Sequence, residues 1–404
     1  MTGTPDVAVV VTHYDDQRRL SLVLAALAVQ TLAADRFEVV VADDGSPEPP
    51  ELGERPYRVS RVRQEDRGFR ASAARNLGAA ATTAPLLCFL DGDTTPEPAY
   101  LAEVLAAADA LGEGLLVGRR RHADLDGWDE AAVVAWLRGA GPAPAELTEP
   151  RWLQDGFRWT DDLRDADDES YRFVIGAVLS VHRSVLDRAG GWDERFDRYG
   201  GEDWEVANRC WLAGAAFRHV PTAVAWHDGS DFAERDVDRV AVQNHQALVL
   251  ARLLPSPATR PPGLVWRYPQ VVVEVDDRGW SPEQTLLCIA SLLDGADAGV
   301  WLADGTAARD GLLGEDPRLH VGPVPPDVRR RCRAVVVVDR PVECDERLVD
   351  LVAAAPADRA GIRVRHARAA ILHDNRGGAG VQVPGAEIEA GGVLGGLLRA
   401  RSES

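Results

Sequence analysis

Lysine is absent from this sequence, so every one of its 45 basic side chains is an arginine. These are outnumbered by 64 aspartates and glutamates, which gives a formal net charge of −19. A surface this acidic repels phosphate groups, which excludes nucleic acid as a general partner. Apolar runs of the roughly 18 residues that span a membrane are also absent, and Met1–Asp6 carries no basic segment. The sequence therefore predicts neither a membrane span nor export, and we expect a cytoplasmic protein.

Cysteine is sparse, and its spacing suggests no pairing. The five residues are Cys88, Cys210, Cys288, Cys332 and Cys344. No CxxC pair and no Cys/His spacing typical of zinc is present, which excludes a disulfide scaffold and a zinc-finger class. We expect reduced, mostly buried thiols. A Gly-x-Gly-x-x-Gly loop is also missing after the first apolar run, and this argues against a dinucleotide-binding Rossmann domain.

Short apolar runs alternate with segments of helical periodicity. Val7–Val11, Phe37–Ala42 and Leu86–Leu90 are continuous runs, typical of strands buried on both faces of a parallel sheet. The alternation predicts an α/β fold with a mostly parallel sheet flanked by helices. In such sheets, ligands bind at the carboxyl ends of the strands. Residues 119–172 are rich in Asp, Arg and Trp, and we expect an irregular insertion over the site.

The 404 residues suffice for two or three domains. We predict a larger domain over residues 1–254, a proline-rich linker over 255–263 and a smaller α/β domain over 264–404. Two apolar runs of the smaller domain lead into Asp304 and Asp339, as two runs of the larger domain lead into aspartates. The smaller domain is therefore either a degenerate, non-catalytic copy of the larger one or an unrelated α/β domain.

The sharpest local signal is a pair of aspartates, Asp91 and Asp93, separated by Gly92 directly after an apolar run. Two carboxylates at this spacing can face one Mg²⁺ or Mn²⁺ ion, and such an ion usually holds a diphosphate. The alternative is an ordinary turn, in which Asp and Gly are common. Asp43 and Asp44 end the preceding run and supply further carboxylates at the same edge of the sheet.

Other polar residues at this edge suit a nucleotide. Thr12 and Tyr14 follow the first run, and the ring of Tyr14 could lie near a base. Arg70 and Arg75 lie near the start of a predicted helix, where phosphate is favoured. We therefore expect Thr12, Tyr14, Arg70 and Arg75 to contact a phosphorylated ligand together with the aspartates.

The ordered set of motifs resembles that of family 2 glycosyltransferases. The motifs are Val-Val-Thr-His-Tyr, Asp-Asp-Gly-Ser, Ala-Ala-Arg-Asn-Leu-Gly, Asp-Gly-Asp, Gly-Gly-Trp-Asp-Glu and Gly-Gly-Glu-Asp. The resemblance covers about residues 5–230, and Gly190–Arg209 is similar to the galactosyltransferase-type half of chondroitin-polymerase-like enzymes. It implies a catalytic domain of the GT-A fold, a nucleotide-sugar donor such as a UDP-sugar, Mn²⁺ or Mg²⁺ as cofactor, and inversion at the anomeric carbon.

The resemblance also implies roles on the donor side. Asp44 matches the aspartate that binds uridine and ribose, with Asp43 beside it. Asp93 matches the direct metal ligand of the D-x-D motif, and Asp91 acts nearer the ribose and the waters of the metal. His227 occupies the place of a second metal ligand, which a neutral imidazole suits. The alternative for a single histidine at a strand end is a structural role.

On the acceptor side, Asp203, preceded by Glu202, matches the catalytic base. Inversion by one displacement requires a carboxylate that deprotonates the acceptor hydroxyl. The alternative is capping of a helix N-terminus, where acidic residues are favoured. Trp192, Tyr199 and Trp204 could stack against an acceptor sugar, or they could pack in the core.

The acceptor itself stays open: a glycan, a lipid-linked glycan or a small molecule. The family commonly has Gly-Ala-Asn-x-Ser where this chain has Val178 in place of the asparagine. A nucleotidyltransferase would need a Gly-rich basic loop after the first run, and none is present. A non-catalytic nucleotide-sugar sensor or scaffold is the other alternative, against which the intact carboxylates argue.

Overall fold

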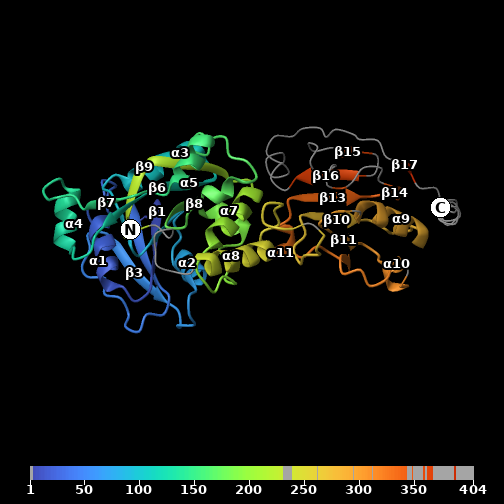
Figure 1. The fold of residues 1–404 in the computed structure, drawn as a ribbon, viewed down its shortest axis with the longest axis horizontal. Helices are drawn as coiled ribbons and strands as arrows, with labels where there is room; N and C mark the ends of the chain where they lie inside the picture. The colour runs from blue at the N-terminus through green and yellow to red at the C-terminus, as the bar shows by residue number, and fades with distance from the viewer. Residues whose placement is uncertain are drawn as a thin grey trace. The chain divides into compact units, whose positions relative to one another are not determined.

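The computed structural model describes most of the chain in two units. The described residues are 3–230, 239–261, 263–293, 295–311, 313–343, 348, 358–359, 362–366 and 386–387. The first unit comprises Met1–Trp211 and Ala215–Val249, and the second comprises Leu212–Gly214 and Leu250–Ser404 (Figure 1). The boundary at Val249 lies within helix α8 (Arg239–Leu253).

A nine-stranded sheet forms the first unit. Its order is β3-β2-β1-β4-β8-β6-β9-β5, with β7 beside β6. The strands are β1 (Val7–His13), β2 (Phe37–Asp43), β3 (Arg58–Arg63), β4 (Leu86–Asp91), β5 (Thr94–Pro96), β6 (Gly114–Asp124), β7 (Ala145–Leu147), β8 (Val178–His182) and β9 (Ala216–Asp228). Strands β3, β2, β1 and β4 run parallel, and β8 runs antiparallel between β4 and β6. The expected α/β class with parallel strands flanked by helices is confirmed.

Helices pack on this sheet through small and aliphatic side chains. They are α1 (Gln17–Leu27), α2 (Ala71–Ala80), α3 (Tyr100–Leu111), α4 (Glu130–Leu137), α5 (Arg151–Trp159), η1 (Ser170–Phe173), α6 (Arg183–Ala189), α7 (Glu202–Leu212) and the first part of α8. Asp16 caps α1 by accepting from the backbone N–H of Arg19. On α2, Gly78 lets the helix approach β1, because a Cβ there would lie 2.4 Å from Cγ1 of Val10.

The segment 119–172 is more regular than its composition predicts. It continues β6 and then contains α4, β7, α5 and η1. Helix α4 packs beside α1, where Val133 joins a buried cluster with Leu22 and Ala26 (Figure 1). The expectation of an irregular insertion was wrong, because buried apolar residues of its short helices, such as Val133 of α4 and Leu153 and Phe157 of α5, anchor this segment to the sheet unit.

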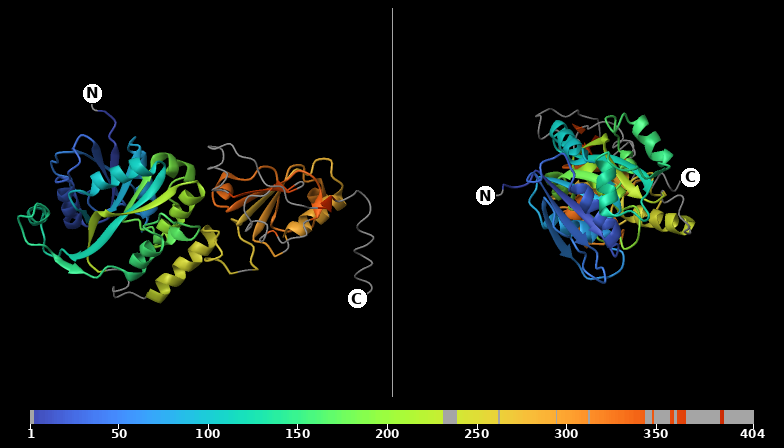
Figure 2. Two further views of the ribbon diagram at one scale, coloured as in Figure 1. Left: turned by 90° about the horizontal axis from the view of Figure 1, so that it is seen from above. Right: turned by 90° about the vertical axis from the view of Figure 1, so that its left-hand side faces the viewer.

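The second unit has its own smaller sheet, of order β12-β11-β10-β13-β16-β15. Its elements are β10 (Val271–Val275), α9 (Pro282–Leu293), β11 (Ala298–Leu302), α10 (Thr306–Arg309), β12 (Leu319–Val321), α11 (Pro326–Arg329), β13 (Ala334–Val338), β15 (Asp358–Arg359) and β16 (Ile362–His366), with β14 (Val342–Glu343) paired to β17 (Ala386–Glu387). Figure 2 gives two further views of the ribbon of this unit. Cys288, Ile289 and Leu292 of α9 belong to one buried cluster with valines of β10 and β11.

The strand order of the first unit recurs in the second. Strands β12, β11, β10 and β13 are parallel, and β16 pairs antiparallel with β13. The series β3-β2-β1-β4-β8 has the same order and the same directions. The two sheets therefore share the topology of one half-sheet, as expected for a duplicated unit.

Hydrogen bonds at the strand ends align the two sheets. The N–H of Asp44 donates to the carbonyl of His13 at 2.8 Å, and the N–H of Ala303 donates to the carbonyl of Val275 at 3.0 Å. If His13 and Val275, the last residues of β1 and β10, are matched, Ala303 corresponds to Asp44. The sequence pattern paired Asp304 with Asp43. In this alignment, Asp304 instead lies one residue beyond the counterpart of Asp44.

The next strand is aligned in the same way. Asp91 lies opposite Thr12 in the first sheet, and Val337 lies opposite Glu274 in the second. Since Val275 is matched with His13, Glu274 is matched with Thr12, and their partners Val337 and Asp91 correspond as well. Asp339, which the sequence pattern paired with Asp91, lies two residues after Val337. In this strand-end alignment, the second sheet has Ala303 and Val337 where the first has Asp44 and Asp91.

Two further observations concern the whole described chain. Four cysteines, Cys88 and Cys210 in the first unit and Cys288 and Cys332 in the second, are free and buried. Cys344 lies outside the described residues. No described helix combines the length and the hydropathy that crossing a bilayer requires.

Candidate functional site

A cavity of about 400 Å³ lies at the carboxyl ends of β1, β2 and β4. The carboxyl ends of neighbouring parallel strands meet at one edge of a sheet, which brings their polar side chains together. Eight residues singled out from the sequence lie on its wall: Thr12, Tyr14, Asp44, Arg75, Asp91, Asp93, Tyr199 and Glu202. Thr12 and Glu202, which are 190 residues apart along the chain, therefore share one site.

Asp43 and Asp44 have different roles: Asp43 is structural, and Asp44 faces the cavity. Asp43 is fully buried and accepts from the backbone N–H of Ser46 at 3.1 Å, which closes the turn after β2. Asp44 faces the cavity and accepts from the N–H of Arg70 at 2.8 Å. Burial raises the pKa of Asp44, against the hydrogen bonds from Arg70 and Gln64, which lower it. Arg70 thus holds Asp44 through its backbone, while its side chain contacts Glu194 at 3.4 Å.

Gly92 is required by the close approach of two strands. A Cβ at this position would lie 2.7 Å from the carbonyl oxygen of Thr12. Because Gly92 has no side chain, the backbone from Asp91 to Asp93 can pass close to Thr12 at the end of β1. Asp93 precedes β5, whose Thr94 lies opposite His227 of β9, and this antiparallel pairing brings His227 to the D-x-D motif.

Asp93 and His227 face each other, with 3.3 Å between Oδ2 and Nε2. Nδ1 of His227 lies 3.2 Å from the carbonyl oxygen of Gly229, which can only accept, so Nδ1–H donates to it. Nε2 faces Asp93 and donates to it when the ring carries a second proton. Burial would raise the pKa of Asp93, but the hydrogen bond and charge of His227 and the charge of Arg19 lower it to about 2. A carboxylate and an imidazole nitrogen thus converge on one point.

This donor set fits a cation that takes most of its ligands from elsewhere. Among the described residues, no group of three or more His, Cys, Asp or Glu side chains could hold a metal ion. Mg²⁺, and similarly Mn²⁺, is commonly bound by one or two protein side chains together with substrate phosphates and waters. Asp93 and His227 match that pattern.

Arg75 connects the D-x-D motif to α7. Its Nη2 donates to Asp91 at 3.0 Å and its Nη1 donates to Glu202 at 3.2 Å. The guanidinium carbon lies 4.5 Å from the ring centroid of Trp192, which is 2% exposed and also packs edge-on against Phe89. Trp192 is therefore a buried support for Arg75 in this structure.

Asp203 lies beside Glu202 in the first turn of α7. Its Oδ1 accepts from the N–H of Trp204 at 2.9 Å, and its Oδ2 accepts from the N–H of Gly176 at 3.3 Å. Burial and the negative charge of Glu202 raise the pKa of Asp203 to about 7, against the lowering effect of the two amides and of Arg75. A carboxyl group with this pKa can both accept and release a proton near neutral pH.

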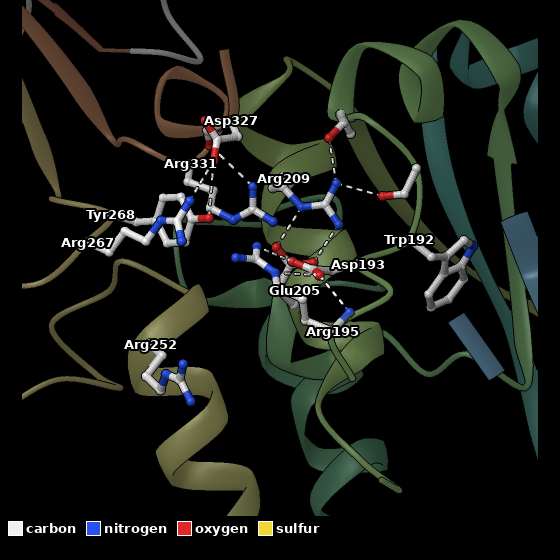
Figure 3. A network of polar contacts seen from close by, with 12 residues as sticks. Trp192, Asp193, Arg195, Glu205, Arg209, Arg252, Arg267, Tyr268, Asp327 and Arg331 are labelled. Atoms are coloured by element: carbon white, nitrogen blue, oxygen red, sulfur yellow. Dashed lines mark hydrogen bonds and ion pairs between the residues drawn. The ribbon is translucent and has the colours of Figure 1, made fainter. Parts of the chain in front are cut away.

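A buried ion pair fixes α7 to the loop that carries Trp192. Glu205 and Arg209 pair across one helical turn, and both side chains are almost fully buried. Arg209 also donates to the carbonyl oxygens of Ala189 and Gly191 (Figure 3). The Gly-Gly-Trp-Asp-Glu segment and the start of α7 therefore keep a fixed geometry.

Arg19 is a cavity residue that the sequence did not reveal. It lines the cavity from the first turn of α1, and its Nε donates to Asp228 at 2.8 Å. Arg18 donates to the same carboxylate oxygen at 2.6 Å but does not line the cavity. No motif signals Arg19, because its position depends on Asp228 at the end of β9, 209 residues away.

Aromatic side chains surround the mouth of the cavity. Tyr14, Phe69 and Tyr199 line it and are 53%, 38% and 46% exposed. The rings of Phe69 and Tyr199 meet edge to face, with 6.3 Å between centroids. Trp204 lies off the cavity wall and packs against Tyr171. Of the three aromatic residues expected at the acceptor, only Tyr199 lies on the cavity wall.

Comparison with known proteins identifies this part of the chain. Residues 8–188 match the family model described as glycosyl transferase family 2, and residues 167–227 match the model described as the N-terminal domain of galactosyltransferase. The first unit is thus a glycosyltransferase domain. Over residues 8–188 it matches glycosyl transferase family 2, the family that its motifs resemble.

The similar proteins are mostly longer than this chain. Chondroitin synthase of Escherichia coli is 30% identical over 268 residues, which is 62% of this chain and 38% of that protein. Validoxylamine A glucosyltransferase of Streptomyces hygroscopicus subsp. limoneus is 33% identical over 229 residues, 51% of this chain and 48% of that protein. The chain thus spans less than half of each of these relatives.

Among solved structures, a mannosyltransferase from Pyrobaculum calidifontis, in complex with GDP-Man and Mn²⁺, is 19% identical. The match covers 62% of this chain and 63% of that chain, with a TM-score of 0.41.

Proposed function

We propose that this chain transfers a sugar from a nucleotide-diphosphate donor, a UDP-sugar, to an acceptor hydroxyl with inversion at the anomeric carbon. The observation that carries the proposal is the bridge made by Arg75. One guanidinium binds Asp91 of the D-x-D motif and Glu202 next to Asp203. Asp91 and Glu202, the neighbour of the proposed base Asp203, therefore lie on one cavity wall, which puts the base next to the donor-binding carboxylates.

The donor is held by groups around the cavity. Asp44 accepts hydrogen bonds from the base or ribose, and the exposed ring of Tyr14 lies on the same wall. Arg19 offers a positive charge to the diphosphate. Asp93 and His227 would hold Mg²⁺ or Mn²⁺, which stabilises the charge that develops on the leaving diphosphate.

Asp203 supplies the base. Its carboxylate accepts the proton of the acceptor hydroxyl as the oxygen forms a bond to the anomeric carbon. The bond from that carbon to the donor phosphate breaks on the opposite side, and the electron pair leaves with the nucleoside diphosphate. The products are the glycoside, the nucleoside diphosphate and a protonated Asp203, which returns its proton to water.

A pH profile tests the state of this base. Since the pKa of Asp203 is raised to about 7 by burial and Glu202, the active carboxylate form is lost as the pH falls below 7. We expect kcat/KM to fall about tenfold per pH unit below 7 and to level off above about 8. Circular dichroism across the same range controls for unfolding. A profile that is flat between pH 5 and 8 would contradict the assignment.

Arg19→Ala tests the diphosphate contact, with Arg18→Ala as its matched control. Both side chains bind Asp228, but only Arg19 lines the cavity. Loss of a charged hydrogen bond of roughly 1.5–3 kcal/mol predicts UDP binding about tenfold weaker or more in Arg19→Ala. Calorimetric titration with UDP and with uridine checks this, because only UDP binding should change. Equal effects of both variants would assign Arg19 a structural role.

The reaction class is tested by following the products with a panel of nucleotide sugars and Mn²⁺. A glycosyltransferase releases a nucleoside diphosphate, and the release increases with an acceptor. A nucleotidyltransferase releases pyrophosphate instead. A non-catalytic nucleotide-sugar sensor binds donor without any release, and that result would replace the present proposal.

We also propose that residues 264–404 form a degenerate, non-catalytic domain. Ala303 and Val337 stand where the first sheet has Asp44 and Asp91, and neither can bind a ribose or a cation. In the full chain, the double variant Asp93→Ala with Asp203→Asn should therefore leave no transfer. Residual transfer at a tenth or more of the parent rate would indicate a second active site.

A further inference from the structure

We infer that the sugar transferred by this chain is uncharged, and that the carboxylates around Glu202 exclude a donor whose sugar carries a carboxylate. The inference rests on the proposed function and names its substrate class: a UDP-hexose or a UDP-N-acetylhexosamine, as opposed to a UDP-hexuronic acid. Two features of the cavity wall support this class, an excess of carboxylates and a buried oxygen of Glu202.

Carboxylates outnumber the basic groups on the wall of the donor cavity. Two arginines line it, Arg19 and Arg75, against five carboxylate residues, Asp16, Asp44, Asp91, Asp93 and Glu202. His13 is the other basic residue among the described residues of the wall, and burial lowers the pKa of its ring. The imidazole therefore adds no positive charge near neutral pH.

The proposed reaction locates the sugar within this cavity. In a single displacement, the anomeric carbon lies between the base and the diphosphate that leaves. The transferred sugar therefore lies between Asp203 at the start of α7 and the D-x-D motif. Arg75 joins these two places, because its Nη1 donates to Glu202 and its Nη2 donates to Asp91. The wall nearest the sugar is thus formed by Asp91, Arg75 and Glu202.

The guanidinium of this part of the wall is already paired. Arg75 is 3% exposed, and both of its Nη groups donate to carboxylates. Asp203 adds a third carboxylate when it is in the deprotonated form that acts as the base. Three negative charges thus surround one positive charge, and a sugar carboxylate brought here would be repelled.

Arg19 belongs to the other side of the cavity. Its Nε donates to Asp228 at 2.8 Å, and its Nη1 lies 3.3 Å from Oδ2 of Asp16. Its charge also lowers the pKa of Asp93, the proposed cation ligand. This guanidinium therefore faces the cation and the diphosphate. The charge of a cation at Asp93 and His227 would likewise be balanced by Asp93 and the diphosphate, which leaves none for a sugar carboxylate.

Glu202 has one oxygen that lacks a hydrogen-bond donor. Oε1 accepts from Arg75 at 3.2 Å, whereas Oε2 is buried with no hydrogen-bond partner in the part of the chain that the structure describes. A buried acceptor without a donor is costly, so a ligand that supplies a donor is favoured. A hydroxyl or an acetamide N–H can donate to this oxygen, whereas the carboxylate of a hexuronic acid can only accept.

Two pairs of donors that differ only at C6 test the inference. They are UDP-glucose with UDP-glucuronic acid, and UDP-galactose with UDP-galacturonic acid. Each compound is titrated into the full chain in the presence of Mn²⁺, with UDP as the reference. We expect the acidic member of each pair to bind at least about tenfold more weakly than its uncharged partner, because like charges brought together in a binding site are strongly unfavourable.

Glu202→Gln removes one negative charge and keeps an oxygen for Arg75, and Glu194→Gln is its matched control. Glu194 lies off the cavity wall and contacts Asn76 and Arg70. Glu202→Gln should lower the ratio of the two affinities severalfold. Glu194→Gln should leave the ratio within about twofold, because an exposed charge is screened. UDP binding by Glu202→Gln, together with circular dichroism, controls for unfolding.

Equal affinities within either pair would overturn the inference, and so would a preference that Glu202→Gln leaves unchanged. Equal transfer of acidic and uncharged sugars would also overturn it, while leaving the proposed glycosyltransferase activity intact. A preference in binding without release of any nucleoside diphosphate would instead overturn the proposed activity. The two proposals are thus tested separately.

Discussion

Asn in place of Asp203 is expected to lower the rate of sugar transfer by roughly 10²–10⁴-fold, the range that a general base contributes. Donor affinity should stay within about twofold, because Asp203 lies off the donor wall and accepts hydrogen bonds from the amides of Trp204 and Gly176. Single-turnover kinetics, together with UDP titration, separates the two quantities.

Glu194→Gln is the matched control for that variant. Glu194 is a half-exposed carboxylate of the neighbouring Gly-Gly-Trp-Asp-Glu segment and contacts Asn76 and Arg70. Its loss should change turnover by no more than a few fold. If Asp203→Asn retained more than a tenth of the parent rate, or lost donor affinity and turnover together, Asp203 would not be the base.

The second large effect is expected at the cation. Asp93→Ala should weaken Mn²⁺-dependent UDP binding on the order of a hundredfold, since even the loss of groups that only support a metal ligand costs 10–100-fold. His227→Ala should have an effect in the same direction. Calorimetric titration of UDP with and without Mn²⁺ measures the metal-dependent part of the affinity.

His122→Ala provides the matched control for His227→Ala. The two rings lie 5.0 Å apart, and Nδ1 of each contacts the carbonyl oxygen of Gly229. Of the two, His227 is the one whose Nε2 meets Asp93. A loss of metal dependence in His227→Ala but not in His122→Ala supports ligation. Equal losses would give both histidines a packing role, and an unchanged metal effect in Asp93→Ala would rule out the D-x-D assignment.

Much of the fold was predictable because its centre follows simple patterns. β1 and β4 are runs of buried aliphatic residues, and α7 begins at Glu202 after two glycines with positive φ, as expected. Strand β3 was missed because it reads Arg-Val-Ser-Arg-Val-Arg and is mostly exposed at the sheet edge. Edge strands lack the apolar run that marks buried ones.

The site was predictable where motifs end strands, and less so where distant segments meet. Asp44, Asp91 and Asp93 follow apolar runs directly, so their shared edge could be inferred. Arg19 could not, because it is positioned by Asp228. Trp192 is a residue type that often stacks on sugars. Its contact with Arg75 could not be predicted, because it depends on the fold of the Gly-Gly-Trp segment.

Each unit contains two buried free cysteines, whose reaction with a thiol reagent would report local unfolding of that unit. Burial raises the pKa of Cys88 to about 11 and that of Cys210 and Cys332 to about 12, so little reactive thiolate exists in the folded state. A thiol reagent can therefore modify these residues only when the surrounding structure opens. In a chain with Cys344→Ser, mass spectrometry of the labelled peptides would time the opening of the glycosyltransferase unit at Cys88 and Cys210. The same experiment would time the second unit at Cys288 and Cys332, within one intact molecule.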